Sequence, residues 1–148
     1  MSNLTLGDLS ITGLIDIKSF TIPVKTLFPD FNDSLVKILE PSEQLIVSRG
    51  LINLTIRSWL LRQSGQNILI DTCVGAEKNR PNHPHWHKRD GIEWLAALDK
   101  EGLKPEDIDI VMCTHLHADH VGWNTKLENG SWVPTFKNAQ YVCGRHEY

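Results

Sequence analysis

Apolar and polar positions along the first part of the chain predict strands. Residues 11–20 set apolar side chains among polar neighbours, which predicts an extended segment, and the prolines that follow it predict a loop. The apolar runs at 45–47 and 51–61 predict two further strands. Between these segments, residues 35–39 predict a short helical turn that stops before a proline.

The middle of the chain predicts a turn, a buried strand and a long loop. Residues 64–67 are typical of a hairpin turn, and the short apolar strand predicted at 68–72 ends in an acid and a threonine. The stretch 75–88 is polar and punctuated by prolines, so it predicts a loop.

The clearest helical pattern begins after this loop. Asp90 and Glu93 have the spacing of a capping box, and Gly102 is typical of a helix end. The apolar face predicted for this helix consists of Ile92, Leu95 and Ala96.

The last part of the chain predicts a second buried strand and a hairpin. Residues 105–107 predict a short turn, 108–113 a largely apolar strand, and 114–122 a polar loop. The segments 131–133 and 140–143 predict the two strands of a hairpin.

The order strand, helix, strand, preceded by antiparallel-type strands, predicts an α/β layered domain. No repeat, low-complexity tract or linker interrupts the chain. The loop at 114–122 leaves the carboxyl end of the last buried strand, which is where open α/β sheets usually build their sites.

Composition and charge exclude several classes of function for this chain. The 148 residues are 41% apolar and 22% charged, and 15 Lys and Arg against 18 Asp and Glu give a net charge of −3. This balance opposes a role in coating nucleic acid. The apolar runs are too short to span a membrane, and the first residues lack the pattern of a secretory signal. We therefore expect a soluble, cytoplasmic protein with no membrane or nucleic-acid partner.

Three cysteines, Cys73, Cys113 and Cys143, form an odd set without Cys-x-x-Cys spacing. They predict neither a disulfide framework nor a thiolate zinc knuckle. We interpret them as buried small apolar residues in a reducing compartment, and a reactive thiol is the alternative.

Seven histidines are more informative, because six of them fall into two tight clusters. One cluster contains His115, His117 and His120 together with Asp119. Side chains two residues apart share a side on an extended chain, so His115 and His117 can present two imidazoles to one ion. Asp119 and His120 follow where the chain turns, and can face a second ion. These nitrogen and oxygen donors suit Zn²⁺, with Fe²⁺, Mn²⁺ or Co²⁺ as alternatives.

The segment His115-Leu116-His117-Ala118-Asp119-His120 resembles the His-x-His-x-Asp-His motif of the metallo-β-lactamase-fold hydrolases, which also follows a buried strand. The resemblance implies an α/β fold, the four-layer αβ/βα sandwich of that family, mainly its N-terminal half. It assigns His115 and His117 to one zinc ion, and Asp119 and His120 to a second. Histidine at position 120 makes the chain more similar to the glyoxalase-II, lactonase and phosphotriesterase-type branches than to classical dizinc β-lactamases.

Two acids receive roles from the resemblance. The segment 68–72 is similar to an earlier family motif whose aspartate, here Asp71, supports the metal centre by accepting a hydrogen bond from a ligand imidazole. An aspartate that ends a strand is otherwise a common turn former. Asp119 is implied to orient the metal-activated water and to accept its proton, as the catalytic base. The implied reaction is hydrolysis of an ester, lactone, thioester or phosphoester.

The resemblance also predicts that the ligand set is incomplete. Full-length family members use a further His, a bridging Asp and a final His, whereas only His146 follows His120 here. We therefore expect residues 1–148 to be the N-terminal part of a longer metallo-β-lactamase-like domain, with 144–147 starting its next helix. His146 is interpreted as a surface histidine, with a substitute ligand as the alternative.

The other histidine cluster, His83, His85 and His87, lies in the polar loop together with Trp86. Alternating histidines can chelate an ion, but the prolines around them favour an exposed loop. The resemblance places this loop near the mouth of a pocket, so Trp86 and His87 are candidate substrate contacts. The other tryptophans are interpreted as core or interface residues: Trp59, Trp94, Trp123 and Trp132.

Three functions fit these observations. The first is a metal-dependent hydrolase of a small-molecule substrate, and the second is a noncatalytic metal-binding module. The third is a nuclease of the same superfamily, which the negative charge opposes. Apolar surface left by an incomplete domain promotes dimerisation or aggregation, so a homodimer is one expected assembly.

Overall fold

The computed structural model describes residues 3–32, 34, 37 and 47–148. Internal contacts divide the chain into two units, Met1–Asp16 with Ile56–Tyr148, and Ile17–Thr55. The residues that the sequence assigns to the site all belong to the first of these units.

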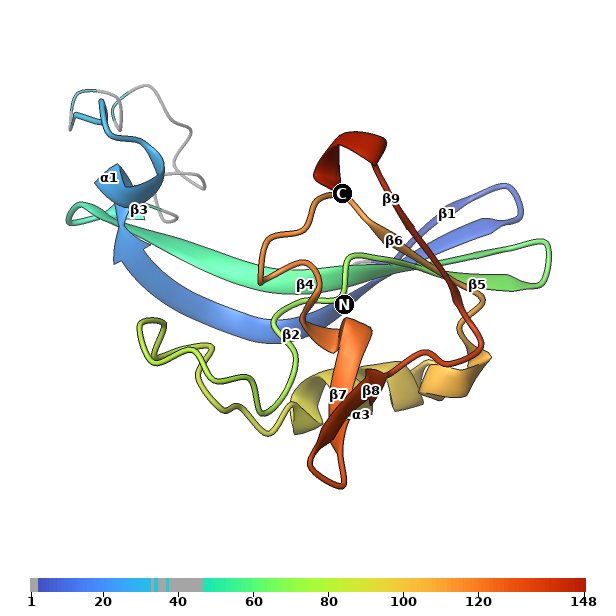
Figure 1. Ribbon diagram of the computed structural model, residues 1–148. Helices are drawn as coiled ribbons and strands as arrows, with labels where there is room; N and C mark the ends of the chain where they lie inside the picture. The colour runs from blue at the N-terminus through green and yellow to red at the C-terminus, as the bar shows by residue number, and fades with distance from the viewer. Residues whose placement is uncertain (1–2, 33, 35–36, 38–46) are drawn as a thin grey trace. The chain divides into compact units, whose positions relative to one another are not determined.

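The main sheet has seven strands, six of them in the order β1-β2-β4-β5-β6-β9, with β3 paired to β4 (Figure 1). The pairs β1–β2, β3–β4 and β4–β5 are antiparallel, whereas β5–β6 and β6–β9 are parallel. The bounds are β1 Asn3–Leu6, β2 Leu9–Pro23, β3 Val47–Ser48, β4 Leu51–Gln63, β5 Gln66–Ile70, β6 Ile110–Cys113 and β9 Gln140–Cys143.

The remaining elements are short. Strands β7 and β8 form a separate two-stranded hairpin, and α3 lies on the same side of the β5, β6 and β9 strands as this hairpin (Figure 1). The bounds are α1 Val24–Leu27, α3 Ile92–Lys100, η2 Pro105–Asp107, η3 Gly122–Asn124, β7 Thr125–Glu128, β8 Ser131–Pro134 and η4 Arg145–Glu147. No helix among the described residues has the length and apolar character needed to cross a membrane.

The structure confirms the α/β class and most of the predicted strands. The predicted segments 11–20 and 51–61 lie within β2 and β4, and 68–72 and 108–113 contain most of β5 and all of β6. Every second residue of β4 from Ile56 to Leu60 is buried, as expected for a strand with one face against the core. The predicted turn at 35–39 lies outside the described residues except for Lys37, and the predicted strand at 45–47 except for Val47.

The predicted apolar face of the helix is wrong. Trp94 and Leu98 are buried, whereas Ile92 is 65% exposed and Leu95 37% exposed, and Ala96 is also exposed. Trp94 and Leu98 are four residues apart and share one side of a helix, and the indole buries more apolar area than an isoleucine does. The larger side chain therefore decides which side of α3 faces the core.

The predicted capping box is also wrong. The helix begins at Ile92, and its N-cap is Gly91, which has a left-handed backbone (φ 69°) and no side chain to bond the first turn. Asp90 instead accepts a hydrogen bond from the Ile92 amide at 3.3 Å, and Glu93 points towards Arg89 at 3.9 Å. The predicted end at Gly102 is confirmed, because α3 ends at Lys100 and Gly102 follows with φ 74°.

The predicted hairpin of 131–133 with 140–143 is wrong as well. Strand β8 pairs with β7, and β9 pairs in parallel with β6. The signal for the true hairpin is Asn129-Gly130, whose φ angles of 51° and 81° match a two-residue turn that reverses the chain between β7 and β8. Residues 140–143 therefore pair with β6 and form the edge strand of the main sheet.

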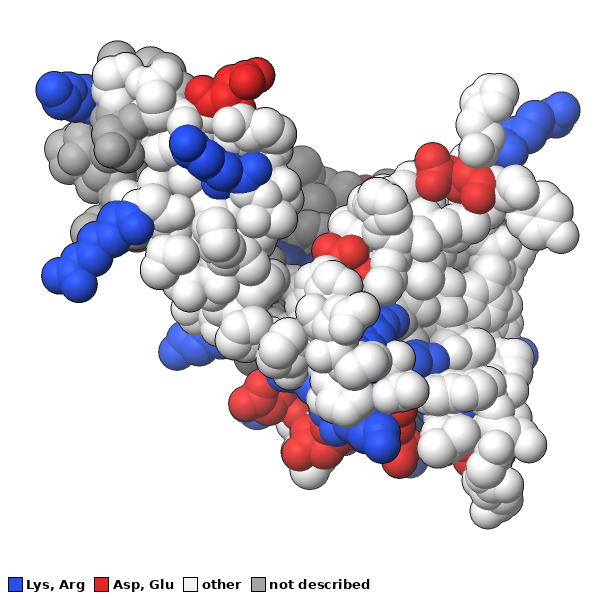
Figure 2. All heavy atoms as spheres, turned by 60° about the vertical axis from the view of Figure 1, so that its left-hand side comes forward, with Lys and Arg blue, Asp and Glu red and all other residues white. Residues whose placement is uncertain are grey.

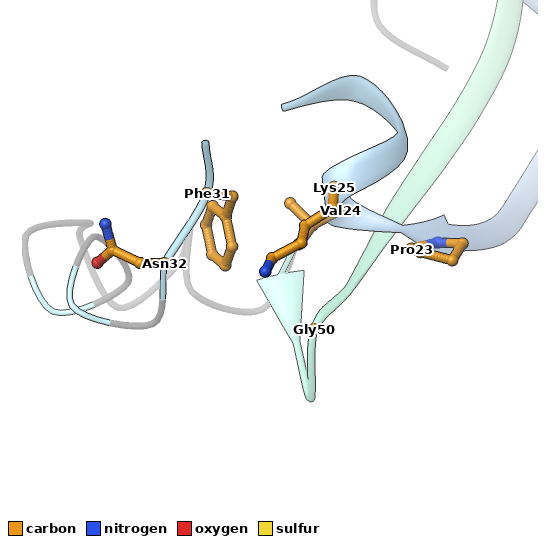
Figure 3. Close-up of a pocket in the computed structure, with 6 residues that line it drawn as sticks. All are labelled: Pro23, Val24, Lys25, Phe31, Asn32 and Gly50. Atoms are coloured by element: carbon orange, nitrogen blue, oxygen red, sulfur yellow. The ribbon is translucent and has the colours of Figure 1, made fainter. Parts of the chain in front are cut away.

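The smaller unit contains a hollow of about 380 Å³ (Figure 3). Figure 3 shows its lining from the end of β2, from α1 and from the turn before β4. It is lined by Pro23, Val24, Lys25, Phe31, Asn32 and Gly50. None of these is a residue that the sequence assigns to the metal site.

Candidate metal centre

The carboxyl ends of three parallel strands meet at one edge of the sheet. Asp71 follows β5, the loop 114–121 follows β6, and η4 follows β9. The Asp71 amide continues the β5–β6 ladder by donating to the Met112 carbonyl at 2.9 Å. Residues far apart in sequence are therefore gathered at the edge where α/β sheets usually build their sites.

Backbone hydrogen bonds tie the end of the histidine loop to the segment after β5. The Thr72 amide donates to the His120 carbonyl at 2.7 Å, and the Trp123 amide donates back to the Thr72 carbonyl at 2.8 Å. The Gly122 amide donates to the Cys73 carbonyl at 2.7 Å. A Cβ on Gly122 would lie 1.9 Å from the Val74 carbonyl carbon, so only glycine permits this approach.

Asp71 organises the start and the end of the loop. Its backbone is left-handed (φ 57°), a conformation that aspartate tolerates. One carboxylate oxygen accepts the Thr114 amide at 2.7 Å, and the Thr114 hydroxyl lies 2.8 Å from the other. The second oxygen is also 2.8 Å from His120 Nδ1. When Nδ1–H donates to Asp71, the lone pair of the neutral imidazole is at Nε2.

The four ligand-type side chains of the loop lie close together. The His115 ring is 3.8 Å from the His120 ring and 4.6 Å from the His117 ring, centroid to centroid. Asp119 Oδ2 is 3.5 Å from His120 Nε2, on the nitrogen that does not face Asp71. Three imidazoles and a carboxylate have the donor chemistry that suits zinc.

The grouping fits a metal by donor type. As the side chains stand in the described part of the chain, however, no three His, Cys, Asp or Glu residues are arranged so that they could hold an ion. The assignment of His115, His117, Asp119 and His120 as ligands, of Asp119 as base and of Asp71 as their support thus stays a prediction.

Arg80 is a residue of this region that the sequence pattern did not reveal. Its guanidinium donates to the Val74 carbonyl at 2.7 Å and to the Ala118 carbonyl at 3.0 Å, which joins the segment after β5 to the histidine loop. Burial lowers the pKa of Arg80, and the nearby Asp119 carboxylate opposes that shift. A lone arginine in a polar loop carries no sequence signal for contacts with backbone carbonyls.

An ion pair between the buried Asp16 and Arg89 contacts the segment after β5. Asp16 is fully buried, accepts the Val74 amide at 3.1 Å and lies 3.2 Å from Arg89. Burial raises the pKa of Asp16, and the charge of Arg89 acts in the opposite direction. This pair fixes Val74, whose carbonyl receives Arg80.

Lys78 connects the same loop to the β7–β8 hairpin. Its ammonium donates to the carbonyl and the hydroxyl of Thr125 at 3.0 and 2.6 Å and stands 3.5 Å from the centre of the Trp132 ring. Burial, with the charge of Arg80, lowers the pKa of Lys78 to about 8. Trp132 is 47% exposed, so its indole contacts the Lys78 ammonium at the surface. Trp94 and Trp123, by contrast, are buried in the core.

The other histidine cluster, in the loop 81–87, makes contacts of its own. The His83 ring stacks on Trp86 at 4.7 Å, and His87 Nδ1 accepts the Arg80 amide at 3.0 Å. His85 is exposed, and Trp86 and His87 are half-buried. These contacts order the loop 81–87, and the substrate contacts expected for Trp86 and His87 stay predictions.

The residues after β9 reach the histidine loop through Glu147. Its carboxylate accepts the Leu116 amide at 3.2 Å, and His146 beside it is exposed. The predicted helical start at 144–147 corresponds to η4.

All three cysteines are free thiols in the structure. Burial raises the pKa of Cys73, whose sulfur lies 3.0 Å from Ser58 Oγ, and of Cys113. The prediction that all three are buried is wrong for Cys143, which is exposed because β9 is the last strand at its edge of the sheet.

Histidine and aspartate side chains at the carboxyl edge of an α/β sheet have the donor types from which metal sites are built. The family model of the metallo-β-lactamase superfamily matches residues 53–144. The chain therefore belongs to the metallo-β-lactamase superfamily, and its fold is the metallo-β-lactamase fold.

Individual relatives agree with this family. An N-acyl homoserine lactonase of Bacillus cereus is 29% identical over 114 residues, which are 67% of this chain and 44% of the lactonase. The dizinc quorum-quenching lactonase AidC, solved with the product N-hexanoyl-L-homoserine, is 25% identical, with a TM-score of 0.73. The hydrolase AbOPH of the β-lactamase superfamily is also 25% identical, with a TM-score of 0.74.

The chain spans less than half the length of each of these proteins. It is covered to 99% by AidC and to 98% by AbOPH, but it covers only 45% and 44% of them. The relatives are metallo-hydrolases or hydrolases of the same superfamily. The proteins to which this chain is similar are therefore hydrolases.

Proposed function

We propose that this chain supplies the first metal-binding loop of a metal-dependent hydrolase that acts on a small-molecule ester or lactone. The observation that carries the proposal is the grouping of His115, His117, Asp119 and His120, with His120 held by Asp71 at 2.8 Å. The similarity to two lactonases supports the lactone class over thioesters and phosphoesters.

In this proposal His115 and His117 hold one zinc ion, and Asp119 and His120 hold a second, with iron, manganese or cobalt as other occupants. When bound, the ions supply Lewis acidity that polarises the substrate carbonyl and makes a water more acidic. The neutral imidazole nitrogens and the carboxylate are the donors such ions require.

The protein residues then orient the reactants and move the proton. Asp119 is 31% exposed, which leaves its carboxylate open to water, and we assign it the role of accepting the proton from the attacking water. Asp71 keeps Nδ1 of His120 occupied, so that Nε2 is presented on the side of Asp119. Arg80 holds the carbonyl of Ala118 and thereby restrains the backbone next to Asp119.

The proposal includes a longer domain. The chain covers 44% of the B. cereus lactonase, so we propose that residues 1–148 correspond to the N-terminal part of such a domain and that further ligands come from beyond them. The free thiols support a reducing compartment, and we propose the cytoplasm.

The net charge of −3 supports a small-molecule substrate over nucleic acid. On the face drawn in Figure 2, Lys and Arg side chains stand apart from one another or beside Asp and Glu, and the described residues of this face form no continuous basic stripe. A nuclease needs such a stripe to hold a phosphate backbone.

The test measures metal content and turnover together. The protein is loaded with zinc, the bound metal is counted, and a panel of lactones and aryl esters is assayed. We expect His115→Ala and His117→Ala to lose most of the bound metal, because each removes a donor nitrogen. The matched controls, His83→Ala and His85→Ala, should keep it.

Equal loss of metal from both histidine clusters would contradict the assignment of the site. Metal binding without turnover on any substrate of the panel would instead favour the noncatalytic metal-binding module for this chain.

A further inference from the structure

Cys113 and Cys143 are direct neighbours on two paired strands. They are register partners in the parallel β6–β9 ladder, which Figure 1 shows as adjacent strands. Neighbouring strands lie about 4.8 Å apart, within the range of about 4.4–6.8 Å between Cα atoms that a disulfide can join. Register partners in parallel strands also point their side chains to the same side of the sheet.

The two thiols differ in exposure. Cys113 is 4% exposed and its sulfur accepts a hydrogen bond from Asn124 Nδ2 at 3.3 Å. Cys143 is exposed on the edge strand, where a small reagent reaches its sulfur. An accessible thiol beside a protected one is the arrangement of an attacking cysteine and a resolving cysteine.

We propose that Cys113 and Cys143 form a reversible thiol–disulfide site that reacts with a low-molecular-weight disulfide of the glutathione type. The Cys143 thiolate attacks the disulfide, forms a mixed disulfide and releases one small thiol. The Cys113 thiolate then attacks the Cys143 sulfur and displaces the second small thiol. Two protein thiols are oxidised to one disulfide, the reagent is reduced to two thiols, and the two protons pass to these products.

The exposure of Cys143 makes this bond easy to reverse. Cys143 lies at the exposed edge of the sheet, so a small thiol reaches the disulfide from solvent. An exposed disulfide is readily reduced by such a thiol.

Oxidation also changes contacts next to the histidine loop. Cys113 immediately precedes Thr114, and its sulfur would turn from Asn124 towards Cys143. Asn124 also accepts the Thr72 hydroxyl at 2.8 Å, so the change reaches the segment that bonds His120. The site goes beyond the proposed hydrolase function and exists without metal.

The experiment treats the reduced protein with oxidised glutathione in the presence of a chelator and follows intact mass and disulfide-mapped peptides. We expect a loss of about 2 Da, from two hydrogens, and a Cys113–Cys143 linkage that reduced glutathione reverses. Cys143→Ser should show no such loss. Cys113→Ser should stop at a glutathione adduct of about 305 Da, and Cys73→Ser should behave like the wild type.

Hydrogen exchange gives a second readout. Amides in residues 114–124 should exchange about fivefold faster in the oxidised protein, the effect of one lost hydrogen bond, and return to their original rate on reduction. A stable Cys143–glutathione adduct in the wild type, a linkage to Cys73, a Cys143–Cys143 link between molecules, or no reaction would each overturn the proposal. Because Cys143 is exposed, Cys143→Ser should fold normally, which circular dichroism checks.

Discussion

At the residue scale, Asp71 contacts both ends of the histidine loop. It accepts hydrogen bonds from the amide and hydroxyl of Thr114 at the start of the loop and faces His120 at its end. Its side chain is 14% exposed, so these contacts are partly shielded from water. A carboxylate with these partners selects one tautomer of His120.

Replacing Asp71 with Asn tests this role without straining the backbone, because asparagine also tolerates the left-handed conformation. The amide offers one acceptor oxygen where the carboxylate offers two, so Thr114 and His120 can no longer both be satisfied. We expect zinc affinity to fall about tenfold to a hundredfold, as measured by competition with a chelator.

The matched control is Asp109→Asn. Asp109 also accepts a backbone amide, that of Asn67 at 2.8 Å, but at the opposite end of β6. Similar losses for the two variants would show that charge alone, and not the contact with His120, explains the effect.

Residue identity predicts some of these roles and not others. The spacing of His115, His117, Asp119 and His120 is a local pattern, and the structure groups their side chains within one loop. Arg80 acts through the carbonyls of two segments that only the fold brings together, so no local pattern could reveal it.

At the scale of elements, two loops are joined by their backbones. The segment after β5 and the end of the histidine loop exchange three hydrogen bonds, and Gly122 lies where they cross. The hydrogen bond from the Thr72 amide holds the backbone carbonyl of His120. This restraint on the backbone also limits where the imidazole ring of His120 can lie.

Gly122→Ala should destabilise the protein by about 3 kcal/mol, the upper end of the usual cost of overpacking, because the new Cβ would lie 1.9 Å from a backbone carbon and one loop must move. Urea unfolding measures the change. Gly144→Ala is the control: its φ of −64° is ordinary, and the nearest atom to a new Cβ is 3.8 Å away. It should change stability by less than about 1 kcal/mol, and equal effects of the two substitutions would contradict the close approach.

The pairing of the last strands illustrates the limit of local patterns at this scale. Residues 140–143 are strand-like by composition, but their partner is β6, about thirty positions earlier in the register of Ile110 with Gln140. A strand pattern specifies extended backbone and leaves the choice of neighbour to the packing of the whole domain.

At the scale of the whole molecule, α3 joins the sheet to the histidine loop through aromatic packing. Trp94 stacks on Trp123 at 5.1 Å, meets Phe136 edge to face at 6.0 Å, and donates from its indole to Ser58 at 3.2 Å. Trp123 directly follows the loop glycine. The core of the larger unit and the site therefore share this contact.

Trp94→Ala should lower the free energy of unfolding by about 3–5 kcal/mol, since it empties a fully buried position and removes the indole hydrogen bond to Ser58. Ile92→Ala, on the same helix at a position that is 65% exposed, should cost less than about 0.5 kcal/mol. Thermal and urea unfolding measure both. A larger loss for Ile92 would restore the helix face that the sequence pattern predicts.

The sequence by itself determined the α/β class, most strands of the sheet and the loop that carries the histidines. These properties depend on alternation, turn residues and ligand spacing, which act over a few neighbouring positions. Tertiary structure decided which side of α3 is buried, which strand pairs with β9, that Arg80 contacts the histidine loop, and that Gly122 lies against Val74. These outcomes depend on competition between distant segments for the same buried surface and the same hydrogen-bond partners, and that competition is resolved only when the chain packs.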